Sequence, residues 1–128
     1  MAYNITLEGK NQIAAENLLK EIATILDQLN INYCLEGGTL LGVYRENRLL
    51  PWDSDLDLSI LDDELHKLDL LTKILKEKKY RIRYRYCDTT DAHFTEGKLR
   101  IIKIRKQRFF GLLKSPVCLE IFIKYKIN

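Results

Sequence analysis

The chain has 128 residues, of which 46% are hydrophobic, and a formal net charge of +3 at pH 7. A chain of this size can bury a hydrophobic core, so we expect a single domain spanning residues 1–128. No stretch approaches the roughly 20 apolar residues needed to cross a bilayer, and the amino terminus lacks the basic and apolar segments of a secretion signal. These features argue against a transmembrane helix and predict a cytoplasmic protein.

Apolar side chains at helical spacing predict that the domain begins with an amphipathic helix. They are Ile13, Leu18, Leu19, Ile22, Ile25, Leu26 and Leu29. A short strand over residues 32–36 is expected next, followed by a tight turn at Gly37 and Gly38 and a helix from Thr39 to Arg45. Glycine in this turn would allow the backbone to approach a ligand closely.

Apolar or aromatic residues that alternate with polar residues predict strands in the rest of the chain. The first runs from Asp55 to Ile60, and a helix follows it, beginning at the acids 62–64 and ending at the basic segment 76–79. Later strands are expected over residues 80–86, 99–104 and 117–125, with a loop over 88–97. This order predicts an α/β (α+β) fold, with a small mixed β-sheet and helices packed on it.

Two aspartates on the strand 55–60 are the first candidates for chemistry. Asp55 and Asp57 alternate with Leu56 and Leu58, so their carboxylates point the same way from α-carbons roughly 7 Å apart. Like charges this close raise each other's pKa unless a cation lies between them. Because hard divalent ions prefer oxygen ligands, the pattern predicts a site for Mg²⁺ or another divalent cation such as Mn²⁺.

This segment has two other interpretations. Asp-rich segments after a proline are commonly solvated turns. The spacing also matches a calcium-binding EF-hand loop, at Asp53, Asp55, Asp57, Ile60 and Glu64. The EF-hand is disfavoured because Leu58 stands where that loop needs glycine, and Pro51 is a poor end for an entering helix.

The segment 38–57 resembles the signature of a known enzyme family. Gly38-Thr39-Leu40-Leu41-Gly42, then Arg45, then Leu50-Pro51-Trp52-Asp53-Ser54-Asp55-Leu56-Asp57 is similar to the motif of the LicD/fukutin phosphotransferases. That family is a branch of the nucleotidyltransferase superfamily, whose palm domain is polymerase-β-like. The resemblance implies a nucleotidyltransferase-like palm with paired acids on one strand and a third carboxylate on a later strand.

The resemblance also implies an activity and a set of site residues. The expected reaction moves a substituted phosphate, such as phosphocholine or a polyol phosphate, from a CDP-linked donor to a glycan hydroxyl. The third acid would be Glu120, which would bind metal together with Asp55 and Asp57. Donor phosphates would contact the start of the glycine-led helix and a nearby base, at Gly37, Gly38, Thr39 and Arg45.

Two positions depart from the family pattern. The family often has Asp where this chain has Ser54, which by strand parity faces away from the aspartate pair. It also more often has Asp than Glu at the position assigned to Glu120. Glu120 shares a strand face with Cys118 and Phe122, where an unpaired acid would be costly to bury unless it binds a cation or a partner.

Basic residues concentrate between Lys73 and Arg108. Such a segment could attract a nucleotide donor, an anionic glycan, a nucleic acid or a membrane surface, or be a solvated strand face. We expect no nucleic acid partner, because no RNA-binding or helix-turn-helix motif accompanies the Tyr and Arg alternation. Two other functions are compatible with the sequence: a nucleotidyltransferase acting on a small molecule or protein, and a catalytically silent nucleotide- or glycan-binding module. The acceptor site could come from a partner subunit or oligomer.

The cysteines and histidines do not suggest a site of their own. Cys34, Cys87 and Cys118 are far apart and lack zinc-site spacing, so we interpret them as reduced structural residues. His66 and His93 are equally isolated and are interpreted as ordinary histidines.

Overall fold

A computed structural model describes residues 5–88, 90, 96–108 and 113–126 of the chain. His93 and most of the loop expected over 88–97 lie outside the described residues. The interpretation of His93 therefore stays a prediction.

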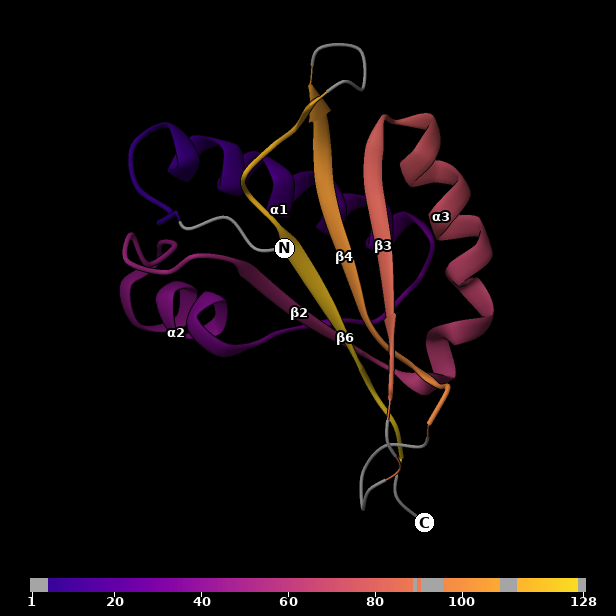
Figure 1. The fold of residues 1–128 in the computed structure, drawn as a ribbon. Coiled ribbons are helices and arrows are strands. Elements are labelled where there is room, and N and C mark those ends of the chain that lie inside the picture. Colours follow the sequence, from indigo (N-terminus) through magenta and orange to yellow (C-terminus); the bar gives the residue numbers. More distant parts are fainter. Residues whose placement is uncertain (1–4, 89, 91–95, 109–112, 127–128) are drawn as a thin grey trace.

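The described strands form a mixed sheet, as expected (Figure 1). They are β1 (Cys34–Leu35), β2 (Leu56–Leu61), β3 (Tyr80–Tyr86), β4 (Leu99–Arg108), β5 (Leu113–Lys114) and β6 (Leu119–Lys124). Their order is β1-β2-β6-β4-β3, with β5 paired to β4 beside this path. Strands β2 and β6 run parallel and the other pairs are antiparallel, so strands far apart in sequence become neighbours at the centre.

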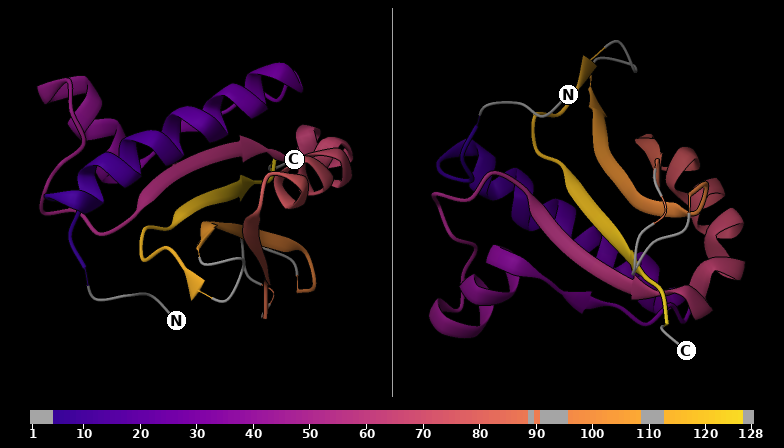
Figure 2. Two further views of the ribbon diagram at one scale, coloured as in Figure 1. Left: turned by 90° about the horizontal axis from the view of Figure 1, so that it is seen from above. Right: turned by 60° about the horizontal axis from the view of Figure 1, so that its bottom comes forward.

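Helices pack on the sheet as the α+β prediction requires (Figures 1 and 2). They are α1 (Lys10–Gln28), α2 (Gly37–Glu46), the 3₁₀ helix η1 (Asp62–Lys67) and α3 (Leu68–Glu77). Helix α1 crosses one face of the sheet, and α3 lies along β3. Helix α2 packs near β2. Within the described residues, no helix has the length and apolar character needed to span a membrane.

The hydrophobic core lies between the sheet and the helices α1 and α3. Alternate residues of the two central parallel strands point into it and are at most 2% exposed, namely Leu56, Leu58, Ile60, Leu119, Ile121 and Ile123. The opposite residues of these strands therefore project from the other face, which α1 does not cover. We call this second surface the open face of the sheet.

Several boundaries differ from the sequence predictions. Ile13, expected on the buried stripe of the first helix, is 65% exposed, and Ala15 is buried instead. At 100° per residue, Ala15 continues the line of Leu18 and Ile22, whereas Ile13 points well away from it. The strand expected over 32–36 is limited to β1, and the helix expected after β2 begins with the 3₁₀ turn η1.

Candidate active site

The aspartate pair lies at the start of β2. Asp57 belongs to the strand and Asp55 immediately precedes it, and both side chains are half-buried. Their neighbours Leu56 and Leu58 are fully buried on the core side, so Asp55 and Asp57 project from the open face. Ser54 is exposed.

Glu120 is the direct neighbour of Asp57 on the parallel strand β6. Residues in register on adjacent strands project from the same face, so the two carboxyl groups share the open face. On its other side Glu120 is in register with Lys103 of β4, whose Nζ lies 3.3 Å from Glu120 Oε1. Glu120 is thus not the unpaired acid considered from the sequence, because Lys103 supplies a positive charge.

The backbone of the glycine turn, at Gly37 and Gly38, lies close to the carboxyl groups of Asp57 and Asp53. Gly37 has a φ of +52°, in the left-handed region that favours glycine. A Cβ at Gly37 would lie 3.3 Å from Oδ2 of Asp57, and one at Gly38 would lie 2.9 Å from Cγ of Asp53. The turn can therefore approach Asp53 and Asp57 only because both residues lack a side chain.

Thr39 fixes α2 to β2 through its hydroxyl group. It lies in the first turn of α2, with Glu36 at the N-cap position. The side chain is 1% exposed, and its Oγ1 accepts a 2.9 Å hydrogen bond from the N–H of Asp57. Glu36 adds two further links: its N–H donates to the Asp57 carbonyl at 2.9 Å, and its carboxylate accepts from Ser59 Oγ at 2.6 Å. These bonds hold the start of α2 beside the aspartates.

Arg45 lies apart from the other predicted site residues. It is in the last turn of α2 and exposed, whereas the glycines and Thr39 are in the first turn. Arg45 follows Thr39 by six helical positions, which corresponds to about 9 Å along the axis. The neighbouring Glu46 pairs with Arg48 at 2.7 Å.

The site concentrates negative charge. Burial raises the pKa of Asp57 to about 6, and neighbouring carboxylates add to this rise: Glu120, Asp55, Asp53 and Glu36. Burial followed by repulsion from Glu120 also raises the pKa of Asp55, although Arg105 and Lys103 oppose the rise. A cation between Asp55 and Asp57 would relieve this repulsion.

The sequence interpretation missed three residues of this site. Asp53, considered only as part of an EF-hand, touches the glycine turn. Lys103 and Arg105 enter from β4, and Arg105 is 7% exposed and donates from Nη1 to the carbonyl of Pro116 at 2.7 Å. The motif Pro51-Trp52-Asp53 could have drawn attention to Asp53, whereas the positions of Lys103 and Arg105 depend on strand register.

The donor set fits a hard cation in its chemistry, but the described residues do not gather a complete ligand sphere. No three His, Cys, Asp or Glu side chains among them are arranged to hold a metal ion. Asp55 and Asp57 supply oxygen atoms and excess negative charge, which suit a divalent cation. Burial raises the pKa of the nearby Cys118 to about 11, so its thiol is protonated at neutral pH and is a poor ligand.

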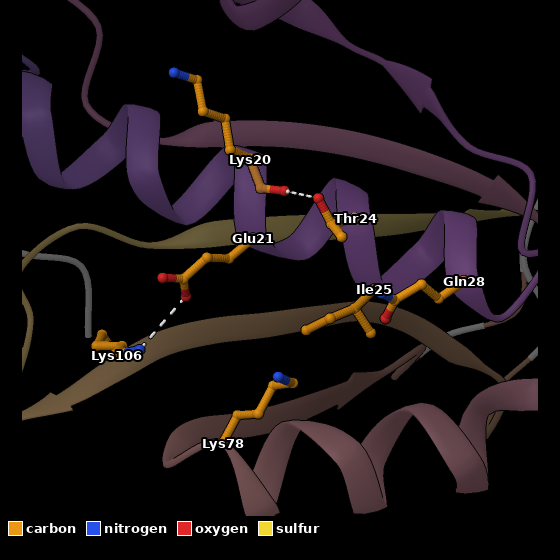
Figure 3. A pocket seen from close by; sticks show the side chains of 7 residues that line it. All are labelled: Lys20, Glu21, Thr24, Ile25, Gln28, Lys78 and Lys106. Carbon is orange, nitrogen blue, oxygen red and sulfur yellow. Dashed lines mark hydrogen bonds and ion pairs between the residues drawn. The ribbon is translucent and has the colours of Figure 1, made fainter.

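A cavity of about 480 Å³ lies away from the acids, beside α1 (Figure 3). Its lining includes Lys20, Lys78 and Lys106, and Lys106 pairs with Glu21 at 3.4 Å. Because α1 covers the face opposite Asp55 and Asp57, this cavity is separate from the candidate site.

Fold and site together define an α+β domain with clustered carboxylates beside a glycine-led helix. Residues 30–116 match the family model described as LicD/FKTN/FKRP, nucleotidyltransferase domain, and the chain belongs to this family. The matched range contains Asp55, Asp57 and the glycine turn and ends before Glu120. The resemblance seen in the motif is therefore confirmed.

Individual relatives agree with this assignment. An uncharacterized protein of Rickettsia prowazekii is 29% identical over 121 residues, covering 94% of this chain and 36% of the relative. The lipopolysaccharide cholinephosphotransferase LicD of Haemophilus influenzae is 27% identical over 115 residues, covering 89% of this chain and 43% of the relative. Human ribitol 5-phosphate transferase FKRP is 33% identical over 58 residues, covering 45% of this chain and 12% of the relative. The chain thus spans less than half the length of these relatives.

Proposed function

We propose that this chain transfers a substituted phosphate group, such as phosphocholine or a polyol phosphate, from a CDP-linked donor to a hydroxyl group of a glycan. The observation that carries the proposal is the placement of Asp55, Asp57 and Glu120 on one face, beside the glycine turn, in a member of this family. The names of the relatives support the class of reaction, because they are a cholinephosphotransferase and a ribitol 5-phosphate transferase.

The start of α2 is suited to hold the donor. The first amides of an α-helix lack acceptors within the helix and carry a partial positive charge, which favours phosphate. Gly37 and Gly38 let the start of α2 approach the carboxyl groups of Asp57 and Asp53 closely, and Thr39 keeps the first amides of the helix next to Asp57. Arg45, at the far end of α2, would have to reach a more distant part of the donor.

Asp55 and Asp57 would hold a divalent cation, with Glu120 as a further ligand or a partner of these acids. When bound, Mg²⁺ or Mn²⁺ neutralises charge on the phosphates of the donor. Asp57 is also placed to receive the proton of the acceptor hydroxyl, because its carboxyl group projects from the open face beside the start of α2. Lys103 neutralises the charge of Glu120 until the cation and the donor bind.

A catalytically silent nucleotide- or glycan-binding module is the second candidate. The observation that favours it is the Lys103 to Glu120 ion pair, which satisfies the third acid without a metal. Nucleotidyl transfer to a small molecule or protein would use the same acids and is the nearest alternative enzyme.

Thermal unfolding with panels of ligands would test the proposal. CDP-choline, CDP-ribitol and nucleoside triphosphates would each be titrated with Mg²⁺ or with EDTA. We expect the CDP-linked compounds to raise the melting temperature with Mg²⁺, increasingly with concentration. Asp55→Asn and Asp57→Asn should each lose this response, and Asp69→Asn, an exposed aspartate of α3, should keep it.

Product analysis would separate the three candidates. Transfer of the substituted phosphate with release of CMP supports the proposal, whereas release of pyrophosphate from a triphosphate indicates nucleotidyl transfer. Ligand binding that is unaffected by EDTA and by both aspartate variants, without turnover, indicates a silent module.

A further inference from the structure

The open face changes the sign of its charge from β2 to β3. Asp57 of β2 is in register with Glu120 of β6. Lys103 of β4 is in register with Glu120 on one side and with Arg83 of β3 on the other. Because residues opposite each other on adjacent strands share a face, these side chains form one row that begins with two acids and ends with two bases.

Arg83 and Arg85 form the basic end of the open face, and we call these two residues the arginine face. Both are exposed, and they line a cavity of about 370 Å³ together with Tyr86, Asp88 and Arg100. Within the part of the chain that the structure describes, neither Arg83 nor Arg85 forms an ion pair. Their guanidinium groups are therefore available to an anionic ligand.

The arginine face lies within reach of a ligand that also reaches the acids. Adjacent strands are about 4.8 Å apart, so three steps place the Cα atom of Arg83 about 14 Å from that of Asp57. A sugar unit with a charged substituent can bridge much of this distance. The cavity volume also falls within the range of about 300–1,000 Å³ typical of small-ligand pockets.

The two sides of the acids have different environments. The amides of α2 approach Asp57 from the side of β1, and the bases approach Glu120 from the side of β4. In-line transfer needs the incoming hydroxyl and the leaving group on opposite sides of the phosphorus atom. If the leaving group of the donor lies on the α2 side, the incoming hydroxyl lies on the opposite side of the phosphorus atom, where β6, β4 and β3 form the surface.

We propose that the arginine face binds the acceptor, and that this acceptor is an anionic glycan bearing phosphate or carboxylate groups. This inference rests on the proposed phosphotransfer, which places the donor beside α2. Arg83 and Arg85 bind the anionic substituent, while Lys103 lies between it and the acids. The face selects the acceptor by charge and takes no part in the chemistry.

Calorimetry would test the proposal by measuring the affinity for a phosphomannan oligosaccharide. The same oligosaccharide after phosphatase treatment is the uncharged control. Arg83→Glu/Arg85→Glu is compared with Lys20→Glu/Lys78→Glu, which changes the net charge equally but at the cavity beside α1 (Figure 3). We expect at least 10-fold tighter binding of the phosphorylated form, and loss of this preference only in the arginine variant. The double variant Arg83→Lys/Arg85→Lys should keep most of the preference for the phosphorylated form, because the positive charges remain.

Equal loss in both charge-reversed variants would overturn the proposal, since the binding would then depend on net charge alone. Tighter binding of a single-stranded oligonucleotide than of phosphomannan, lost in the arginine variant, would also overturn it in favour of a nucleic acid. Inorganic phosphate should bind weakly and should not compete at equal concentration, because it lacks the sugar.

Transfer assays distinguish failure of this inference from failure of the proposed function. If Asp57→Asn abolishes transfer while wild-type protein uses phosphorylated and neutral acceptors equally, only the inference about the acceptor fails. If transfer is absent with every donor, the proposed function fails, although the binding experiment still reports on the arginine face.

Discussion

The hydroxyl group of Thr39 accepts a hydrogen bond from the backbone N–H of Asp57, joining the first turn of α2 to the strand that carries the aspartate pair. The two residues are 18 positions apart, and Thr39 is almost fully buried. The distance between the helix start and the acids is therefore set by a side chain inside the fold.

Replacing Thr39 by valine should destabilise the domain by about 1–3 kcal/mol, because the N–H of Asp57 would lose its acceptor. Denaturant unfolding would measure this change. Thr39→Ser keeps a hydroxyl group and should recover much of the loss. If valine and serine variants are equally stable, the hydrogen bond does not contribute as inferred.

Asp57 should make folding stability depend on pH in the absence of divalent cations. Its pKa is raised from 3.8 to about 6 in the folded protein, so between these values the folded state binds more protons than the unfolded state. Stability therefore falls as pH rises through this window, and the penalty is complete above pH 6. In EDTA, the melting temperature of Asp57→Asn relative to wild type should increase from pH 4 to pH 7.

The matched control for this pH series is Asp69→Asn, at an exposed position of α3. It should not show the same increase relative to wild type. A constant difference between Asp57→Asn and wild type across the range would contradict the raised pKa.

The Lys103 to Glu120 ion pair should be strongly coupled. Their side chains are only 18% and 14% exposed, so removing one partner leaves a largely buried charge. Lys103→Met and Glu120→Gln should each cost about 1–3 kcal/mol, and the double variant should cost less than their sum. A double-mutant cycle by chemical denaturation measures the coupling.

The exposed pair of Lys126 and Asp63 provides the comparison, since its side chains are 57% and 56% exposed. Its coupling should be much weaker, because solvent screens exposed charges and the two long side chains lose freedom when they pair. Equal coupling in the two cycles would mean that burial does not strengthen the pair at the site.

Gly38 should tolerate alanine only when Asp53 is shortened. An added Cβ would overlap the Asp53 carboxyl group, so Gly38→Ala should destabilise the protein by about 1–3 kcal/mol. In an Asp53→Ala background the same substitution should cost clearly less. Melting temperatures of the four proteins would measure this difference, and an equal cost in both backgrounds would show that the carboxyl group is not the obstacle.

The sequence by itself determined most of the helices and strands, and the face of the strand from which the two aspartates project. The 3.6-residue periodicity identified α1 and α3, and the alternation of Asp55 and Asp57 with leucines showed that both acids leave one face of a strand. These properties are local, because each residue's direction follows from its place in a single helix or strand. The family motif is local as well, which is why the resemblance could be recognised before the fold was known.

Only the tertiary structure decided which side chains meet. Glu120 lies 63 positions from Asp57, and the register of two parallel strands makes them neighbours. The register of β4 then pairs Lys103 with Glu120, so a lysine of the same sheet is a partner of this acid. Strand order and register depend on the packing of the whole core, and a single strand's pattern of apolar residues does not encode its partner.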